Sequence, residues 1–151
     1  MTNINLQNKR YQGFTLIESL IVLTAAILLL GLPLIIGNQT KENVIAAQFF
    51  SSLEKHLLFT QQMAIVGGKD GQIFFSAEDR TIVFSFASGK EQLSIPKDLS
   101  ASGPSIITFK NGSGNNSQLS RYSFDWKEKG ERIVFQFQMG SGRFVKKISQ
   151  L

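Results

Sequence analysis

An apolar segment near the start of the chain is the feature that most limits its structure. Phe14–Ile36 carries a single ionisable side chain, Glu18. As an α-helix this segment is roughly 34 Å long and matches the roughly 30 Å hydrocarbon core of a bilayer. Lys9 and Arg10 precede it, and no acidic residue does. The positive-inside rule therefore predicts a single-pass membrane helix, with the N-terminus cytoplasmic and the C-terminal domain extracytoplasmic.

Two ordinary explanations of this segment leave something unexplained. A cleaved secretory signal has an apolar core of about 7–15 residues and then a small-residue cleavage site, whereas Gly31-Leu32-Pro33 is followed by further apolar residues. A plain anchor fits the length but not Glu18, because a charge at mid-helix costs about 2.5–3.5 kcal/mol, and less near an end. Glu18 is therefore a candidate functional residue.

One octapeptide of the chain, GFTLIESL at 13–20, resembles the processing site of type IV pilins and pseudopilins. The resemblance implies cleavage after Gly13 by a prepilin peptidase and N-methylation of the new amino group on Phe14. It implies a leader peptide (1–13), a transmembrane or filament-core helix (14–36), an amphipathic continuation (37–68) and a β-sheet domain (69–151). Glu18 would pair with the Phe14 amine of an adjacent subunit and set the axial register of a filament.

The spacing of these residues has a physical reason. A carboxylate four residues beyond an amine lies one helical turn away, so Glu18 can face the Phe14 amine of its own chain or of a neighbour. In a low-dielectric layer opposite charges attract strongly, and an unpaired charge is penalised. We therefore expect Glu18 to favour assembly and to select the stagger between subunits.

The family also implies partners and a location. The partners are other major and minor pilins, the prepilin peptidase, the membrane and, indirectly, the pilus assembly platform and its ATPase. The location is the cell membrane, and the cell surface once the chain is assembled in a pilus.

A second helix pattern follows in Lys41–Val66. Its predicted apolar face consists of Ile45, Phe49, Leu53, Leu57 and Ala64, widened by Phe50 and Leu58. Gly67-Gly68 ends the helix. We expect Gly31, Pro33 and Gly37 to bend or partly melt the helix between its two halves, because proline removes a backbone donor.

The remainder of the chain has the pattern of antiparallel strands separated by short polar turns. Seven strands are predicted, at 72–76, 81–87, 92–95, 105–110, 121–126, 132–139 and 143–149. A long polar loop at 111–120 is expected to be mobile. The predicted fold is α+β and pilin-like, with a long N-terminal helix packed on a C-terminal antiparallel β-sheet.

No enzyme is predicted. The chain has no cysteine, so a thiolate metal site and a cysteine nucleophile are excluded. His56, the single histidine, has no acidic or serine partner at a fixed spacing and is interpreted as a helix-face residue. The glycine-rich turns do not match a phosphate-binding loop. We expect no catalytic residue, no metal and no cofactor.

DNA contact is a weaker hypothesis. The net charge is +5, but Lys9 and Arg10 supply two of the 16 basic residues, which leaves only +3 from Phe14 onward. Basic residues beside aromatic ones in the last third can hold a DNA backbone, with Arg143, Lys146 and Lys147 as the candidates. A solvated basic face over an aromatic core explains the same pattern and is favoured.

The closing segment IVFQFQMGSGRFVKKI at 133–148 resembles the last hairpin of minor pseudopilins from Gram-positive competence systems. The leading hypothesis is therefore a minor pseudopilin of a competence pilus that mediates DNA uptake. The alternatives are a minor pseudopilin of a type II secretion system and a single-pass membrane-anchored binding protein.

Overall fold

The computed structural model describes residues 15–116 and 118–151, without the side chains of 30–40. Its elements are α1 (Leu16–Val66), β1 (Gly71–Ser76), β2 (Thr81–Phe86), β3 (Gly89–Ser94), β4 (Leu99–Ser102), β5 (Ile106–Phe109), β6 (Arg121–Trp126), β7 (Glu131–Phe137) and β8 (Phe144–Gln150). The described residues divide into two compact units, one that ends at Thr40 and one at Lys41–Leu151.

The backbone of α1 is helical through Gly31, Pro33 and Gly37. The predicted melting of the helix there is wrong. Proline removes one donor, but its φ near −65° is compatible with a helix, so the remaining hydrogen bonds are sufficient. Among the residues whose side chains are described, no helical segment is long and apolar enough to span a bilayer. Part of the predicted span, at 30–36, lies outside that set.

One face of the second half of α1 is buried against the strands, as its periodicity predicts. The apolar residues on it are 0–5% exposed: Ala46, Phe49, Phe50, Leu53, Leu57 and Ala64. Thr60 lies on the same face, where its hydroxyl donates a 2.7 Å hydrogen bond to the His56 carbonyl. The buried face therefore contains one polar residue, and its polar atom is satisfied locally.

Two residues assigned to this face lie elsewhere. Ile45 is 43% and Leu58 49% exposed. Successive residues of a helix are turned by about 100°, so Ile45 lies roughly 80° and Leu58 roughly 140° from Leu53 around the axis. A row extended in steps of four residues thus drifts off the buried face.

The strands form two antiparallel four-stranded sheets rather than the single sheet that the sequence predicts. The first sheet has the order β3-β2-β1-β5 and the second β4-β6-β7-β8. Strand β4 was missed because its sequence, LSAS, has no β-branched or aromatic residue. It is held by pairing with β6, with Leu99 opposite Trp126 and Ala101 opposite Phe124. The α+β class and the antiparallel pairing are confirmed.

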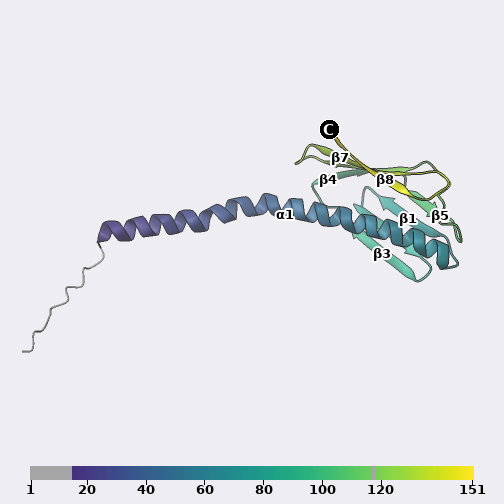
Figure 1. Cartoon of the computed structure of the whole chain (residues 1–151), viewed down its shortest axis with the longest axis horizontal. Coiled ribbons are helices and arrows are strands. Elements are labelled where there is room, and N and C mark those ends of the chain that lie inside the picture. Colours follow the sequence, from purple (N-terminus) through teal and green to yellow (C-terminus); the bar gives the residue numbers. More distant parts are fainter. Residues whose placement is uncertain (1–14, 117) are drawn as a thin grey trace, which may run out of the picture. The chain divides into compact units, whose positions relative to one another are not determined.

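Each sheet turns one aromatic-rich face inward, and the last part of α1 lies beside both (Figure 1). In the first sheet Phe84 is edge-on to His56 of α1, with a ring separation of 5.0 Å. In the second, Phe124 and Phe135 lie 5.6 and 6.3 Å from the ring of Phe50. One helix face therefore completes the core of both sheets.

The loop expected to be mobile is attached to the end of α1. Gly112 donates its backbone N–H to the Ala64 carbonyl at 3.0 Å. The Gln61 side chain donates to the carbonyls of Gly114, at 3.2 Å, and Ser141, at 3.1 Å. Gly114 has a φ of 63°, and a Cβ on it would lie 2.7 Å from Ile65, so only glycine allows this close approach.

Two leucines of α1 test the assignment of its buried face. Leu53→Ala should lower the free energy of unfolding by about 2–5 kcal/mol, because it empties a fully buried site. Leu58→Ala removes the same atoms from an exposed site and should change the free energy of unfolding by less than about 0.5 kcal/mol. Denaturant unfolding followed by Trp126 fluorescence measures both. Equal effects would contradict the assigned face.

Candidate assembly site

The start of α1 is capped by the residue before it. The Glu18 N–H donates to the Thr15 hydroxyl at 3.3 Å and to the Thr15 carbonyl at 3.1 Å. This is one of the two hydrogen bonds of a capping box, the bond from the backbone N–H of a glutamate to the hydroxyl of the threonine three residues before it. Sequence reasoning missed this role, although the T-x-x-E pattern is visible. The Glu18 carboxylate has no hydrogen bond or ion pair within the described part of the chain.

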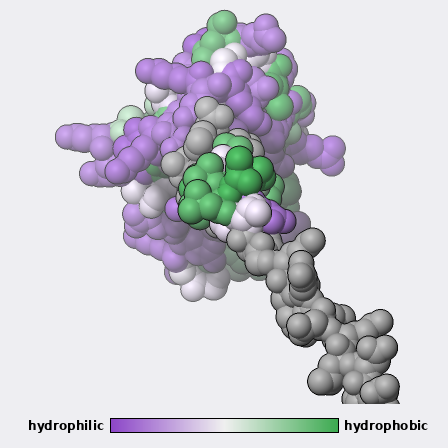
Figure 2. Space-filling model, turned by 90° about the vertical axis from the view of Figure 1, so that its left-hand side faces the viewer, coloured by the Kyte–Doolittle hydropathy of each residue, from purple (hydrophilic) through white to green (hydrophobic). Residues whose placement is uncertain are grey.

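The first turns of α1 expose an apolar surface on all sides. Nine large apolar side chains there are 56–87% exposed: Leu16, Ile17, Leu20, Ile21, Val22, Leu23, Ile27, Leu28 and Leu29. Figure 2 shows the start of the helix as a mostly hydrophobic cluster facing the viewer. An apolar surface of this extent requires cover by lipid or by protein. Gly13 and Phe14, the predicted cleavage and methylation residues, lie outside the described residues.

The three candidate DNA-contacting residues are not brought together on one face. Lys146 is opposite the buried Phe135 in the β7–β8 register, and Lys147 is opposite Val134, so the two lysines point to opposite faces of the sheet. Lys146 turns toward α1 and forms a 2.7 Å ion pair with Glu54. Lys147 lies on the outer face, and Arg143 directly precedes β8.

Other basic residues of this region are also engaged. Arg132 donates two hydrogen bonds to Asp125, of 2.6 and 3.0 Å, which hold the pKa of that carboxyl below its usual value. The Lys129 ammonium lies 4.2 Å from the centre of the Trp126 ring. The positive charge that the sequence concentrates here is therefore partly neutralised and divided between two faces. DNA contact by Arg143, Lys146 and Lys147 stays a prediction.

His56 has an acidic partner that no sequence spacing reveals. Its Nε2 lies 3.1 Å from a carboxylate oxygen of Glu91 on β3, and its ring packs against Phe84. The histidine thus joins α1 to the first sheet. Within the described ranges no group of three histidine, cysteine or acidic residues is arranged to hold a metal ion.

Comparisons with known proteins agree with this geometry. No family model matches the chain. The competence protein ComGD of Streptococcus pneumoniae is 29% identical over 142 residues, which cover 92% of this chain and 81% of that protein. The type IV minor pilin FimU of Pseudomonas aeruginosa superposes with a TM-score of 0.56 at 13% identity, over 72% of this chain and 92% of FimU. The minor pseudopilin EpsH of the Vibrio cholerae type 2 secretion system superposes with a TM-score of 0.52 at 16% identity, over 70% of this chain and 96% of EpsH. The chain has a type IV pilin-like fold.

In this chain with a pilin-like fold, the β domain and the start of α1 differ in how far their apolar side chains are buried. The β domain covers its own core, whereas the described residues of the first unit leave the apolar start of α1 exposed. The sequence predicts the apolar start of α1 from composition alone. It could not identify the Lys146–Glu54 pair, because 92 residues separate the two partners.

Lys146 and Lys147 provide a matched test of these placements. Lys146→Ala should lower the free energy of unfolding by about 0.5–1 kcal/mol, because the Glu54 pair and the contacts with the Phe50 and Phe135 rings are lost. Lys147→Ala should leave it within about 0.5 kcal/mol of the parent. Denaturant unfolding of both variants measures the difference. A larger loss at Lys147 would contradict the assigned faces.

Proposed function

We propose that the chain is a minor pseudopilin, a non-enzymatic structural subunit of a competence pilus that mediates DNA uptake. The observation that carries the proposal is the 29% identity to ComGD over 92% of the chain. An alignment of that extent leaves too few residues to omit either the apolar segment or the β domain. The similarity therefore concerns the whole arrangement and not one common element.

The exposed start of α1 supports an assembly role. Its apolar side chains need an external partner, and lipid before assembly and the helices of other pilins after it would supply one. Processing after Gly13 would create an amine on Phe14, close in sequence to the free carboxylate of Glu18. Pairing of Glu18 with the amine of a neighbouring subunit would remove two unpaired charges from an apolar layer at once.

Two alternatives remain open on specific observations. The fold likeness to EpsH is compatible with a minor pseudopilin of a type II secretion system. The exposed apolar helix alone is also compatible with a single-pass membrane-anchored binding protein. The first alternative shares the filament chemistry at Glu18, whereas the second needs neither processing nor assembly.

Loss of the chain from its native host distinguishes these systems. On the proposed function, deletion should abolish transformation by added DNA and leave the profile of secreted proteins unchanged, and re-expression should restore transformation. Counting transformants and comparing culture supernatants measure both. A secretion defect with normal transformation would instead identify a secretion pseudopilin, and no defect in either would favour the anchored binding protein.

Variants at Gly13 and Glu18 separate processing from assembly. Gly13→Ala should impair leader removal, seen as a larger chain on immunoblots. Glu18→Ala should be processed but absent from sheared filament fractions. Glu18→Gln keeps a capping-box pattern, because glutamine is also accepted at this position, and removes only the charge. This variant should therefore fail to assemble as well. Normal assembly of Glu18→Gln would show that capping, not charge, is what Glu18 supplies.

A further inference from the structure

Strand β8 ends the second sheet and is paired on one side only. Among the described strands, the order β4-β6-β7-β8 leaves its outer edge without a neighbour. Within the described residues, the backbone of Phe144–Gln150 forms its ladder with β7 and makes no backbone hydrogen bond to another element. A row of unpaired N–H and C=O groups seven residues long is a template for an added strand.

This edge is also apolar at several points. Val145 is 41%, Ile148 61% and the adjoining Leu151 58% exposed. Edge strands that must remain unpaired are normally short or strongly charged. Strand β8 has two lysines, and one of them, Lys146, is already engaged by Glu54. The edge is therefore weakly protected against pairing.

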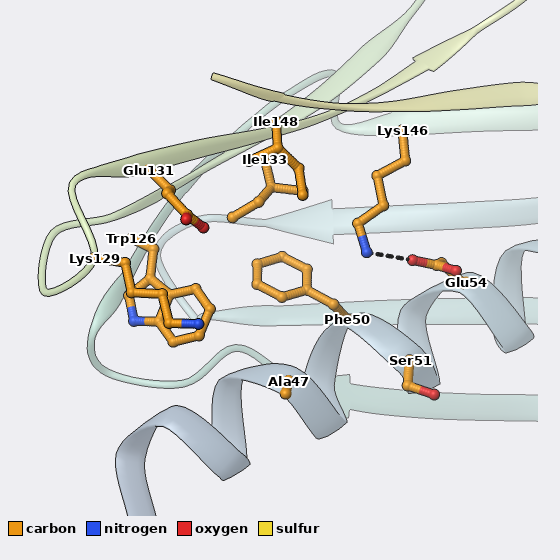
Figure 3. A pocket seen from close by; sticks show the side chains of 10 residues that line it. All are labelled: Ala47, Phe50, Ser51, Glu54, Trp126, Lys129, Glu131, Ile133, Lys146 and Ile148. Carbon is orange, nitrogen blue, oxygen red and sulfur yellow. Dashed lines mark hydrogen bonds and ion pairs between the residues drawn. The ribbon is translucent and has the colours of Figure 1, made fainter. Parts of the chain in front are cut away.

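A pocket of about 380 Å³ opens beneath β8, between the sheet and α1. Its apolar lining includes Phe50 from α1, Trp126 from β6, Ile133 from β7 and Ile148 from β8. Figure 3 shows Ile133 and Ile148 above the Phe50 ring, with the Lys146–Glu54 pair along one side. The volume accommodates one or two aliphatic side chains that enter from the free edge.

The charges of the pocket argue against a polyanion as its occupant. Two acidic residues and two basic residues line it, Glu54, Glu131, Lys129 and Lys146, so their formal charges cancel. A nucleic acid would gain little net attraction there and could not use the alternating N–H and C=O groups of the edge. An extended polypeptide uses both features.

The outer face of β8 carries Lys147, which favours an acidic polypeptide as the added strand. Lys147, at the centre of the outer face of β8, has no ion pair within the described part of the chain. A second copy paired edge to edge about this centre would place Lys147 opposite itself, which is destabilising. An acidic residue at that position of an added strand would instead be attracted to it.

We propose that the β8 edge and the pocket beneath it bind an extended segment of another polypeptide. The segment adds to the sheet beside β8, directs aliphatic side chains toward Phe50 and Ile148, and places acidic side chains beside Lys147. This inference goes beyond the proposed function and does not depend on it, because it requires only the unit Lys41–Leu151.

A pair of synthetic peptides on the full-length chain in lipid nanodiscs tests the proposal. The first is a heptapeptide of alternating glutamate and isoleucine, and the second replaces each glutamate by lysine. The acidic peptide should bind at least about five-fold more tightly, slow amide exchange in β8 and shift the emission of Trp126, the single tryptophan. Lys147→Glu should reverse the preference, so that the variant binds the lysine peptide more tightly than the parent does. Unfolding of the variant would weaken binding of both peptides and cannot produce this gain.

A matched control lies on the other sheet. Lys90 is an exposed lysine on β3, which is also an edge strand, so Lys90→Glu makes the same change of charge and should leave the peptide preference unchanged. Equal binding of the two peptides, an unchanged preference in Lys147→Glu, or exchange protection outside β8 would overturn the proposal. Protection of β8 by self-association without peptide, or by a single-stranded oligonucleotide, would overturn it in favour of that occupant.

Discussion

The β domain depends on one apolar face of the second half of α1. Each four-stranded sheet has an aromatic inner face, and both faces are completed by side chains of this helix: Phe50 packs on Phe124 and Phe135 in one sheet, and His56 packs on Phe84 in the other. Because an exposed sheet face of this composition is unfavourable in water, neither sheet is complete without the helix. The position of Leu53 at the centre of that face follows from this requirement.

A single helix has limited width, and the consequences appear at the margin of the second sheet. Its buried side chains reach β6 and β7 fully, but β8 lies at the edge, and its inner face is only partly covered. Lys146 spans the remaining distance to Glu54 and lays its aliphatic stem over the rings of Phe50 and Phe135. The pocket beside this ion pair is the space that the helix does not fill.

The sequence predicts those features that depend on neighbours along the chain. The helix face follows from apolar periodicity, and seven of the eight strands follow from β-branched and aromatic residues between turns. The division into two sheets does not, because it depends on pairings such as β5 with β1 across three intervening strands. The Glu54–Lys146 and His56–Glu91 pairs depend on distant partners in the same way. Strand β4 has no β-branched or aromatic residue, and it is a strand because it pairs with β6. The Thr15–Glu18 cap is local, and it was overlooked because Glu18 had been weighed only as a charge.

The cap also clarifies what Glu18 can contribute. Its N–H completes the start of α1 through Thr15, and a backbone N–H is present whatever the side chain. The carboxylate is therefore not required for that hydrogen bond, and the capping preference for glutamate is shared by glutamine. A charged group in a largely apolar surface with no other charge from Leu16 to Leu29 carries a cost that capping does not explain. An opposite charge would offset that cost, and on the proposed function the Phe14 amine of a neighbouring subunit would supply it.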